Sequence, residues 1–215
     1  IEFCDRHRSI GGDGIVLIEN SDIADAKMRI FNRDGSEGKM AGNCIRCVGK
    51  FLYDNDMVKK ERMSIETASG IKHLKVFTRE GKVSSVTVQM GKAILEPKKI
   101  PVNFDGDRMV DEKVLIGGKR YSVTCVSVGN PHCVTFVDNV DKIDIEKVGP
   151  KFENNKLFPE RVNTEFVRVV NANTIKMRVW ERGNGETLAC GTGACAAVVA
   201  AVENGYCKKG VDITV

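Results

Sequence analysis

Apolar and polar residues alternate along much of this chain, and alternation with a period of two is typical of half-buried β-strands. Alternating or continuously apolar stretches predict strands over residues 15–18, 27–31, 72–77, 83–90, 121–128, 133–137, 164–170 and 174–180. Glu80-Gly81 and Asn171-Ala172-Asn173 are short turn sequences between neighbouring stretches. Each of these turns therefore predicts a hairpin.

Three segments with a helical pattern interrupt the strands. Residues 43–54 carry apolar side chains along one face, which predicts an amphipathic helix. Residues 144–152 predict a second helix, with Asp144 as its N-cap and Pro150 as a break or kink. Residues 193–203 are apolar on every side, so this third helix is expected to be central and buried.

The order strands, helix, strands occurs once in each half of the chain. Pro97 and Pro101 bracket the best candidate for a linker. We therefore predict an α+β fold with two pseudo-symmetric lobes, residues 1–96 and 97–215, each wrapping its strands around one helix.

A short element is repeated at the start of two of these helices. Residues 37–42 read Glu-Gly-Lys-Met-Ala-Gly, and residues 186–191 read Glu-Thr-Leu-Ala-Cys-Gly. Each copy follows a turn and precedes a helical segment. The second copy places Cys190 at the helix start, where the first places Ala41.

The start of a helix presents free backbone N–H groups and a partial positive charge, and flanking glycines let an anion approach them. Cys190 in Cys190-Gly191-Thr192-Gly193 is therefore expected to favour its thiolate and to act as a base or nucleophile. The alternative is a structural cysteine at a tight turn. Asn43 and Thr192, each directly after a glycine, could cap their helices or bind a carboxylate. The loop Gly129-Asn130-Pro131-His132 could be a plain turn or could line a site.

The composition narrows the classes of function. Apolar content of 42% and charged content of 29% are ordinary for a soluble globular protein. We see no apolar run of about 18 residues and no signal-peptide pattern, which favours a cytoplasmic protein without membrane association. The net charge of +4 is spread over single residues, which argues against nucleic-acid binding. The sequence leaves a homodimer open.

Eight cysteines in 215 residues are many for a cytosolic protein and few for a disulfide scaffold. Cys44 and Cys47 form a Cys-x-x-Cys pair, a spacing found in zinc and redox sites. No second pair is present, and the histidines are not paired at ligand spacing. We therefore expect reduced thiols and no metal.

Five motifs carry a family resemblance. They are Asn-Arg-Asp-Gly-Ser-Glu at 32–37, Met-Ala-Gly-Asn-Cys-Ile-Arg-Cys at 40–47, Val-Gly-Asn-Pro-His at 128–132, Pro-Glu-Arg-Val-Asn at 159–163 and Glu-Arg-Gly-Asn-Gly-Glu-Thr-Leu-Ala-Cys-Gly-Thr-Gly-Ala-Cys at 181–195. In this order, across essentially the whole chain, they resemble the diaminopimelate epimerases. The last motif is long and specific.

The resemblance implies two lobes, each a strand-rich barrel around a central helix. It also implies cofactor-independent inversion of LL-diaminopimelate to the meso form, on the route to lysine and peptidoglycan. In this reaction one cysteine removes the Cα proton and another returns a proton on the opposite face. Cys190 matches one catalytic thiol, and His132 and Glu181 match residues near the thiols. The residues that match substrate-binding positions are Asn32, Gly42, Asn43, Asn130, Asn163, Glu181, Arg182, Gly191 and Thr192.

The sequence departs from the family pattern at the other thiol. Ala41 stands where the family has its second catalytic cysteine, and a methyl group can neither accept nor donate a proton. We therefore predict that this form is inactive or very slow. Cys44 is expected to point elsewhere on its helix and not to substitute. The family's N-terminal segment and the strands after Val215 are expected to be missing from this sequence.

Two other functions stay open. The chain could be a non-catalytic relative that binds an amino acid, or a racemase or one-base isomerase that acts on another amino acid through Cys190.

Overall fold

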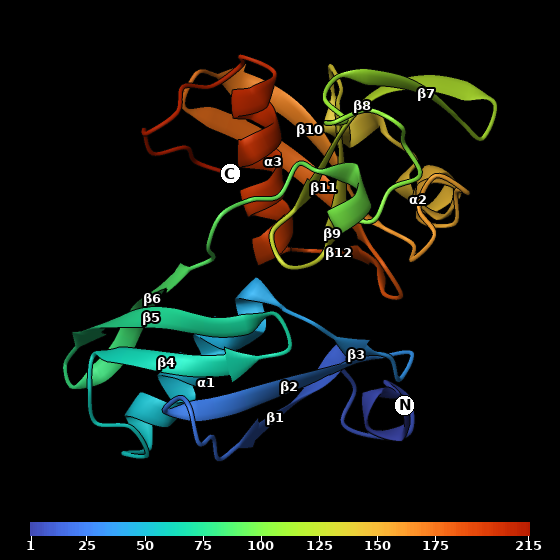
Figure 1. The fold of residues 1–215 in the computed structure, drawn as a ribbon. Coiled ribbons are helices and arrows are strands. Elements are labelled where there is room, and N and C mark those ends of the chain that lie inside the picture. Colours follow the sequence, from blue (N-terminus) through green and yellow to red (C-terminus); the bar gives the residue numbers. More distant parts are fainter. The chain divides into compact units, whose positions relative to one another are not determined.

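Two sheets, one in each half of the chain, organise the fold (Figure 1). The computed structural model describes residues 1–215, which form two compact units, Ile1–Gly91 and Lys92–Val215. Each unit combines a six-stranded sheet with a long helix that packs against it. The predicted α+β fold with two strand-rich lobes is confirmed. The second unit begins at Lys92 because Ile94 already pairs with Ser127.

The sheet of the first unit has the order β1-β2-β4-β5-β6, with a short β3 beside β2. Its strands are β1 (Gly14–Glu19), β2 (Ala26–Asn32), β3 (Glu37–Gly38), β4 (Arg62–Thr67), β5 (Gly70–Arg79) and β6 (Lys82–Gln89). The pairing of β2 with β4 is parallel, and the other pairings are antiparallel. Strand β4 was not among the predicted strands.

Helix α1 (Gly42–Asp54) packs against β5 and β6 and buries Ile45, Val48 and Leu52. Its close approach to the sheet depends on Gly49, because a Cβ at that position would lie 2.8 Å from a methyl of Leu74. The helix starts one residue before the predicted start, at Gly42, and Ala41 is its N-cap residue.

The sheet of the second unit has the order β12-β11-β10-β9-β8-β7. Its strands are β7 (Glu112–Ile116), β8 (Lys119–Ser127), β9 (Pro131–Phe136), β10 (Asn163–Asn171), β11 (Thr174–Glu181) and β12 (Gly185–Thr187). Only β9 and β10 pair in parallel, which sets His132 beside Asn163. Strand β7 was not predicted. Short 3₁₀ helices lie at Glu2–Cys4 (η1), Pro97–Lys99 (η2) and Val140–Lys142 (η3).

Helix α3 (Gly191–Glu203) packs along β8, β9, β10 and β11, as Figure 1 shows in red. Its alanines at 196, 197, 200 and 201 are fully buried, and their small side chains let the helix lie close to the sheet. The prediction of a central buried helix is confirmed, although α3 starts at Gly191 and not at Gly193. The residue before that start is Cys190.

Helix α2 (Ile145–Glu153) packs against β10, β11 and β12 and contains Pro150. Asp144 is the N-cap residue, as predicted, but its side chain makes no capping hydrogen bond. Consecutive residues of one strand belong to different apolar clusters: Phe166 to the cluster under α2 and Val167 to the cluster under α3. The two helices therefore cover opposite faces of one sheet. None of the helices has the length and apolar composition that crossing a membrane requires.

Candidate active site

The first residues of α1 and α3 have matching backbone geometry. Ala41 precedes α1 with φ −140° and ψ 115°, and Cys190 precedes α3 with φ −128° and ψ 110°. Both are N-cap residues in extended conformation, so their side chains leave the backbone in equivalent directions. The N-cap side chain of α3 accepts a hydrogen bond, whereas that of α1 makes none. The repeated sequence element therefore corresponds to two helix starts that differ by one thiol.

Cys190 is buried at the start of α3, with 8% of its surface exposed. Its Sγ accepts a hydrogen bond from the Gly193 N–H at 3.3 Å and lies 3.5 Å from the Thr192 hydroxyl. A Cβ at position 193 would lie 3.2 Å from this sulfur and 2.7 Å from Oε1 of Glu165. The glycine at 193 therefore lets a carboxylate and the thiol approach the same turn of backbone.

Burial raises the pKa of Cys190 to about 12, and the charges of Glu181 and Glu165 contribute to this rise. Hydrogen bonds from Thr192 and from the Gly193 N–H act in the opposite direction and lower the pKa. Burial therefore opposes the thiolate that the helix start was expected to favour. The helix start does stabilise the anion, but removal of the sulfur from water has the larger effect.

A chain of buried polar groups extends from Cys190 into the sheet. The amide Nδ2 of Asn130 donates to Thr192 Oγ1 at 3.2 Å, and Oδ1 of the same amide lies 2.9 Å from Nε2 of His132. Nδ1 of His132 lies 2.7 Å from Oε1 of Glu165. His132 and Glu165 are both fully buried. The structure thus brings three predicted site residues, Asn130, His132 and Thr192, into one hydrogen-bonded series with the thiol.

The strands position these groups by simple alternation. His132 on β9 and Glu165 on β10 are each two residues from a valine of the cluster under α3, Val134 and Val167. Side chains two residues apart share a face of a sheet. Both polar side chains therefore point to the α3 side, below the first turn of that helix.

Asn163 links two loops at the same end of the sheet. Its Nδ2 donates to the carbonyl of Pro131 at 2.9 Å, and its Oδ1 accepts from the backbone N–H of Arg182 at 2.9 Å. Glu181 accepts a short hydrogen bond from the hydroxyl of Thr187, and the guanidinium of Arg182 donates to the carbonyl of Glu160. The buried side chain of Asn163 uses both its nitrogen and its oxygen in these bonds, so its visible role is to fix the loop geometry.

The predicted residues of the first unit lie at the end of β2 (Asn32) and at the start of α1 (Gly42 and Asn43). Asn32 donates to the hydroxyl of Ser36 at 3.1 Å. Asn43 accepts a short hydrogen bond from the guanidinium of Arg46, one turn further along the helix. Gly42 is buried, and Cys44 is partly buried against the apolar core of this unit.

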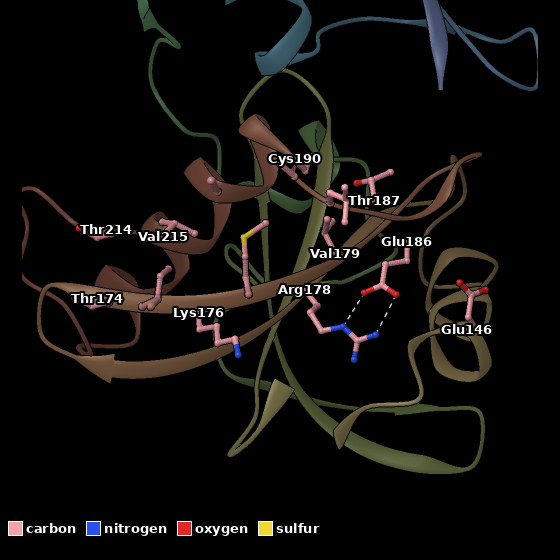
Figure 2. A pocket seen from close by; sticks show the side chains of 15 residues that line it. Glu146, Thr174, Lys176, Arg178, Val179, Glu186, Thr187, Cys190, Thr214 and Val215 are labelled. Atoms are coloured by element: carbon pink, nitrogen blue, oxygen red, sulfur yellow. Dashed lines mark hydrogen bonds and ion pairs between the residues drawn. The ribbon is translucent and has the colours of Figure 1, made fainter. Parts of the chain in front are cut away.

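A pocket of about 610 Å³ opens beside Cys190 in the second unit. Its walls come from β11, β12 and the start of α3, together with Glu146 of α2 and with Thr214 and Val215 (Figure 2). Arg178 and Glu186 face one another there and form a bidentate ion pair, with N–O distances of 2.7 and 3.0 Å. Cys190 belongs to the lining, whereas Asn130 and His132 do not. The thiol therefore has a pocket on one side and the buried polar chain on the other.

Sequence reasoning missed Glu165. Glu165 lies in the stretch 164–170, which also contains Thr164 and Arg168, so its charge reads as an outward-facing position. Its burial follows from the packing of α3 on this face of the central strand β10, a contact between segments distant in sequence.

Comparison with known proteins decides the family. The family model described as diaminopimelate epimerase matches residues 1–96 and 124–215. The chain belongs to the diaminopimelate epimerase family. A diaminopimelate epimerase of Acetivibrio thermocellus is 56% identical over 205 residues, which cover 95% of this chain and 73% of that protein. One from Methanococcus maripaludis is 54% identical over 202 residues, covering 94% of this chain and 73% of that protein.

Solved structures of other epimerases and racemases share the fold. A probable proline racemase from Agrobacterium radiobacter superposes with a TM-score of 0.74 at 17% identity, covering 99% of this chain and 68% of that chain. A hydroxyproline epimerase from Agrobacterium vitis gives a TM-score of 0.72 at 16% identity, and the match covers 99% of this chain and 66% of that chain. At these identities the likeness concerns the fold alone. The predicted membership of the diaminopimelate epimerase family, a family of isomerases, is confirmed.

Proposed function

We propose that this chain is built for the cofactor-independent, two-base epimerisation of LL-diaminopimelate to meso-diaminopimelate. The reaction is a step of lysine and peptidoglycan biosynthesis, and as such it belongs in the cytoplasm. We further propose that the Ala41 form turns over very slowly or not at all. The observation that supports both parts is the matched geometry of Ala41 and Cys190 at the starts of two helices.

Inversion at a tetrahedral carbon needs a base on one face and an acid on the other. Cys190 supplies one of these groups, and its raised pKa suits the proton donor. When the reverse direction requires a base, the hydrogen bonds from Thr192 and Gly193 support the thiolate. Residue 41 is the place for the partner thiol, and the methyl of Ala41 cannot hold a proton.

The carbanion formed at Cα needs preorganised hydrogen-bond donors. The first N–H groups of a helix have no partner within the helix and point along its axis. The N–H groups at Gly42 and Asn43, and those at Gly191 and Thr192, are the donors proposed for the substrate's α-carboxylate. They bind an anion without pyridoxal phosphate or another cofactor.

The remaining polar groups are proposed to select the substrate. Diaminopimelate carries two amino-acid centres, so its recognition needs both acidic and basic partners. Glu181 and Arg182 supply adjacent opposite charges, and Asn32, Asn130 and Asn163 supply neutral amides. His132 contacts the amide oxygen of Asn130 and is proposed to hold that amide in place.

A non-catalytic amino-acid-binding protein is the second candidate, because the same donors would bind an amino acid without any thiol at position 41. A racemase or one-base isomerase acting through Cys190 alone is a variant of this candidate. These functions differ in whether the Cα–H bond breaks and in whether the product is inverted.

The test follows Cα–H exchange of LL-diaminopimelate in deuterated water by NMR, with chiral chromatography of the products, on the chain in its full natural length. We expect background exchange for the Ala41 form and rapid exchange with formation of the meso product for Ala41→Cys. Ala41→Ser is the matched control, since a hydroxyl of similar size does not ionise in this range.

Three results would count against the proposal. Background exchange by a folded Ala41→Cys variant would remove the epimerase assignment. Inversion by the Ala41 form at the rate of Ala41→Cys would refute the two-thiol argument. Exchange by the Ala41 form without inversion would support one-base chemistry instead.

A further inference from the structure

A buried carboxylate lies below the first turn of α3, in a position that apolar packing would not require. Glu165 is fully buried, and its neighbours on β10, Thr164 and Phe166, are buried as well. A buried carboxylate is costly unless it is paired and hydrogen-bonded. Oε1 of Glu165 is paired with His132, and Oε2 has no hydrogen-bond partner in the protein. The carboxylate is therefore held in place mainly by one histidine.

Both ring nitrogens of His132 face oxygen atoms. Nδ1 lies 2.7 Å from a carboxylate oxygen of Glu165, and Nε2 lies 2.9 Å from the amide oxygen of Asn130. In this orientation of the Asn130 amide its nitrogen donates to Thr192, while its oxygen faces His132. Hydrogen bonds at both nitrogens are satisfied when each carries a proton, with the carboxylate of Glu165 as the counter-charge.

This arrangement makes every hydrogen bond from His132 to Cys190 donate in the same direction. With both ring nitrogens protonated, His132 donates to Asn130, Asn130 donates to Thr192, and the hydroxyl of Thr192 is left to donate to the sulfur of Cys190. A donor that points at the sulfur stabilises the thiolate, whereas the reverse direction would stabilise the thiol.

We propose that Glu165 is a positioning residue for Cys190: it keeps a proton on both nitrogens of His132, so that the buried chain donates toward the sulfur. The proposal rests on the proposed acid–base role of Cys190 and adds a means to ionise a buried thiol. Other ionisable groups near this set are Glu181, on the Cys190 side, and Cys133, next to Glu165.

The first test observes His132 directly. The chain has only three histidines, so the imidazole nitrogens can be resolved by ¹⁵N NMR, and the signals of His132 are assigned by their loss in His132→Gln. We expect both nitrogens of His132 to be protonated at pH 7 in the parent protein, and one to lose its proton in Glu165→Gln. A His132 with an unprotonated Nδ1 in the parent would overturn the proposal.

The second test measures the pH profile of Cys190 alkylation by iodoacetamide, with mass mapping of the peptide that contains Cys190. In Glu165→Gln either tautomer of His132 is satisfied, so the hydrogen-bonded series no longer has to donate toward the sulfur. Alkylation of Cys190 is therefore expected to slow about tenfold, which is equivalent to one pKa unit. Thr192→Val should slow it as well. In the Thr192→Val background, Glu165→Gln should then have little further effect, because the link is already broken.

The control is Glu153→Gln, at the other buried glutamate of the second unit. Glu153 does not belong to the hydrogen-bonded series that ends at Cys190, and its carboxylate accepts a hydrogen bond from Trp180. It should change neither His132 nor the alkylation profile. Faster alkylation in Glu165→Gln would mean that the carboxylate acts only through its charge, and an unchanged profile would mean that it only packs. Either result, or equal effects in both backgrounds, overturns the proposal. None of these readouts depends on turnover, so they remain informative if the proposed epimerase activity is absent.

Discussion

Ala41 and Cys190 hold the same position before two helices, and their φ angles differ by only 12°, from −140° to −128°. The third helical residue differs between the two sites, because α1 has Cys44 where α3 has Gly193. In α3 a Cβ at that place would lie 3.2 Å from the thiol sulfur. The first unit therefore lacks the thiol and also carries a side chain beside the place where the sulfur would lie.

Cys190 is expected to react slowly with alkylating reagents at neutral pH. Burial, together with the charges of Glu181 and Glu165, raises its pKa from 9.0 to about 12. Only the thiolate reacts, so the rate should climb about tenfold per pH unit above neutrality. Mass mapping after iodoacetamide treatment measures this rate, with the exposed Cys47 as the internal comparison. Labelling of Cys190 as fast as Cys47 at pH 7 would contradict the expectation.

The same raised pKa makes stability depend on pH. The unfolded chain releases this proton at a lower pH than the folded chain does. The contribution of Cys190 is therefore complete below pH 9.0 and is lost as the pH rises toward about 12. Urea unfolding of the parent and of Cys190→Ala across this window measures the effect. The loss of stability with pH should be smaller in the variant, and equal slopes would argue against it.

Gly193→Ala should destabilise the start of α3. The added methyl would lie 2.7 Å from Glu165 Oε1 and 3.2 Å from the Cys190 sulfur, and overpacking of this kind costs about 1–3 kcal/mol. Thermal unfolding measures the loss. Gly12→Ala is the comparison, because the nearest atom to its new methyl would lie at 3.6 Å and a shift within about 0.5 kcal/mol is expected. Equal stability of parent and Gly193→Ala would show that the turn relaxes freely.

Most of the fold can be predicted from the sequence, but only part of the candidate site can. Alternation over 164–170 and 174–180 predicts two strands and their hairpin because these signals are local. The two helix starts are likewise recognisable from short motifs. Glu165 is not, since its burial depends on the packing of α3 against β10, and these elements are distant in sequence. The raised pKa of Cys190 was not predicted for a related reason. The motif predicts the start of the helix, but the burial of the thiol depends on strands that are distant in sequence.

Glu153→Leu should unfold the second unit more easily. One carboxylate oxygen accepts from Trp180 Nε1 at 2.7 Å, and the other accepts from the Gly183 N–H and from Arg161, both at 3.0 Å. Its removal leaves buried donors unpaired, which costs about 2–4 kcal/mol. Trp180 is the only tryptophan, so its fluorescence during urea unfolding reports on this unit. Glu153→Gln keeps one acceptor and should lose less. A loss below about 1 kcal/mol in Glu153→Leu would indicate that water replaces the carboxylate.

Substitutions at Ala41 should separate stability from chemistry. The N-cap side chain of α1 makes no hydrogen bond, and Ser at an N-cap is typically more stable than Ala by about 1 kcal/mol. Ala41→Ser should therefore raise the stability of the first unit without Cα–H exchange. Ala41→Cys should restore exchange. Because Cys44 occupies the place of Gly193, Ala41→Cys combined with Cys44→Gly should exchange at least as fast as Ala41→Cys alone.

Urea unfolding and exchange in deuterated water, both under reducing conditions, measure these outcomes. Restored exchange in Ala41→Ser would show that capping, and not the thiol, limits the present form. Loss of exchange on addition of Cys44→Gly would instead assign a role to the Cys44 thiol, and the equivalence between Gly193 and position 44 would then have to be abandoned.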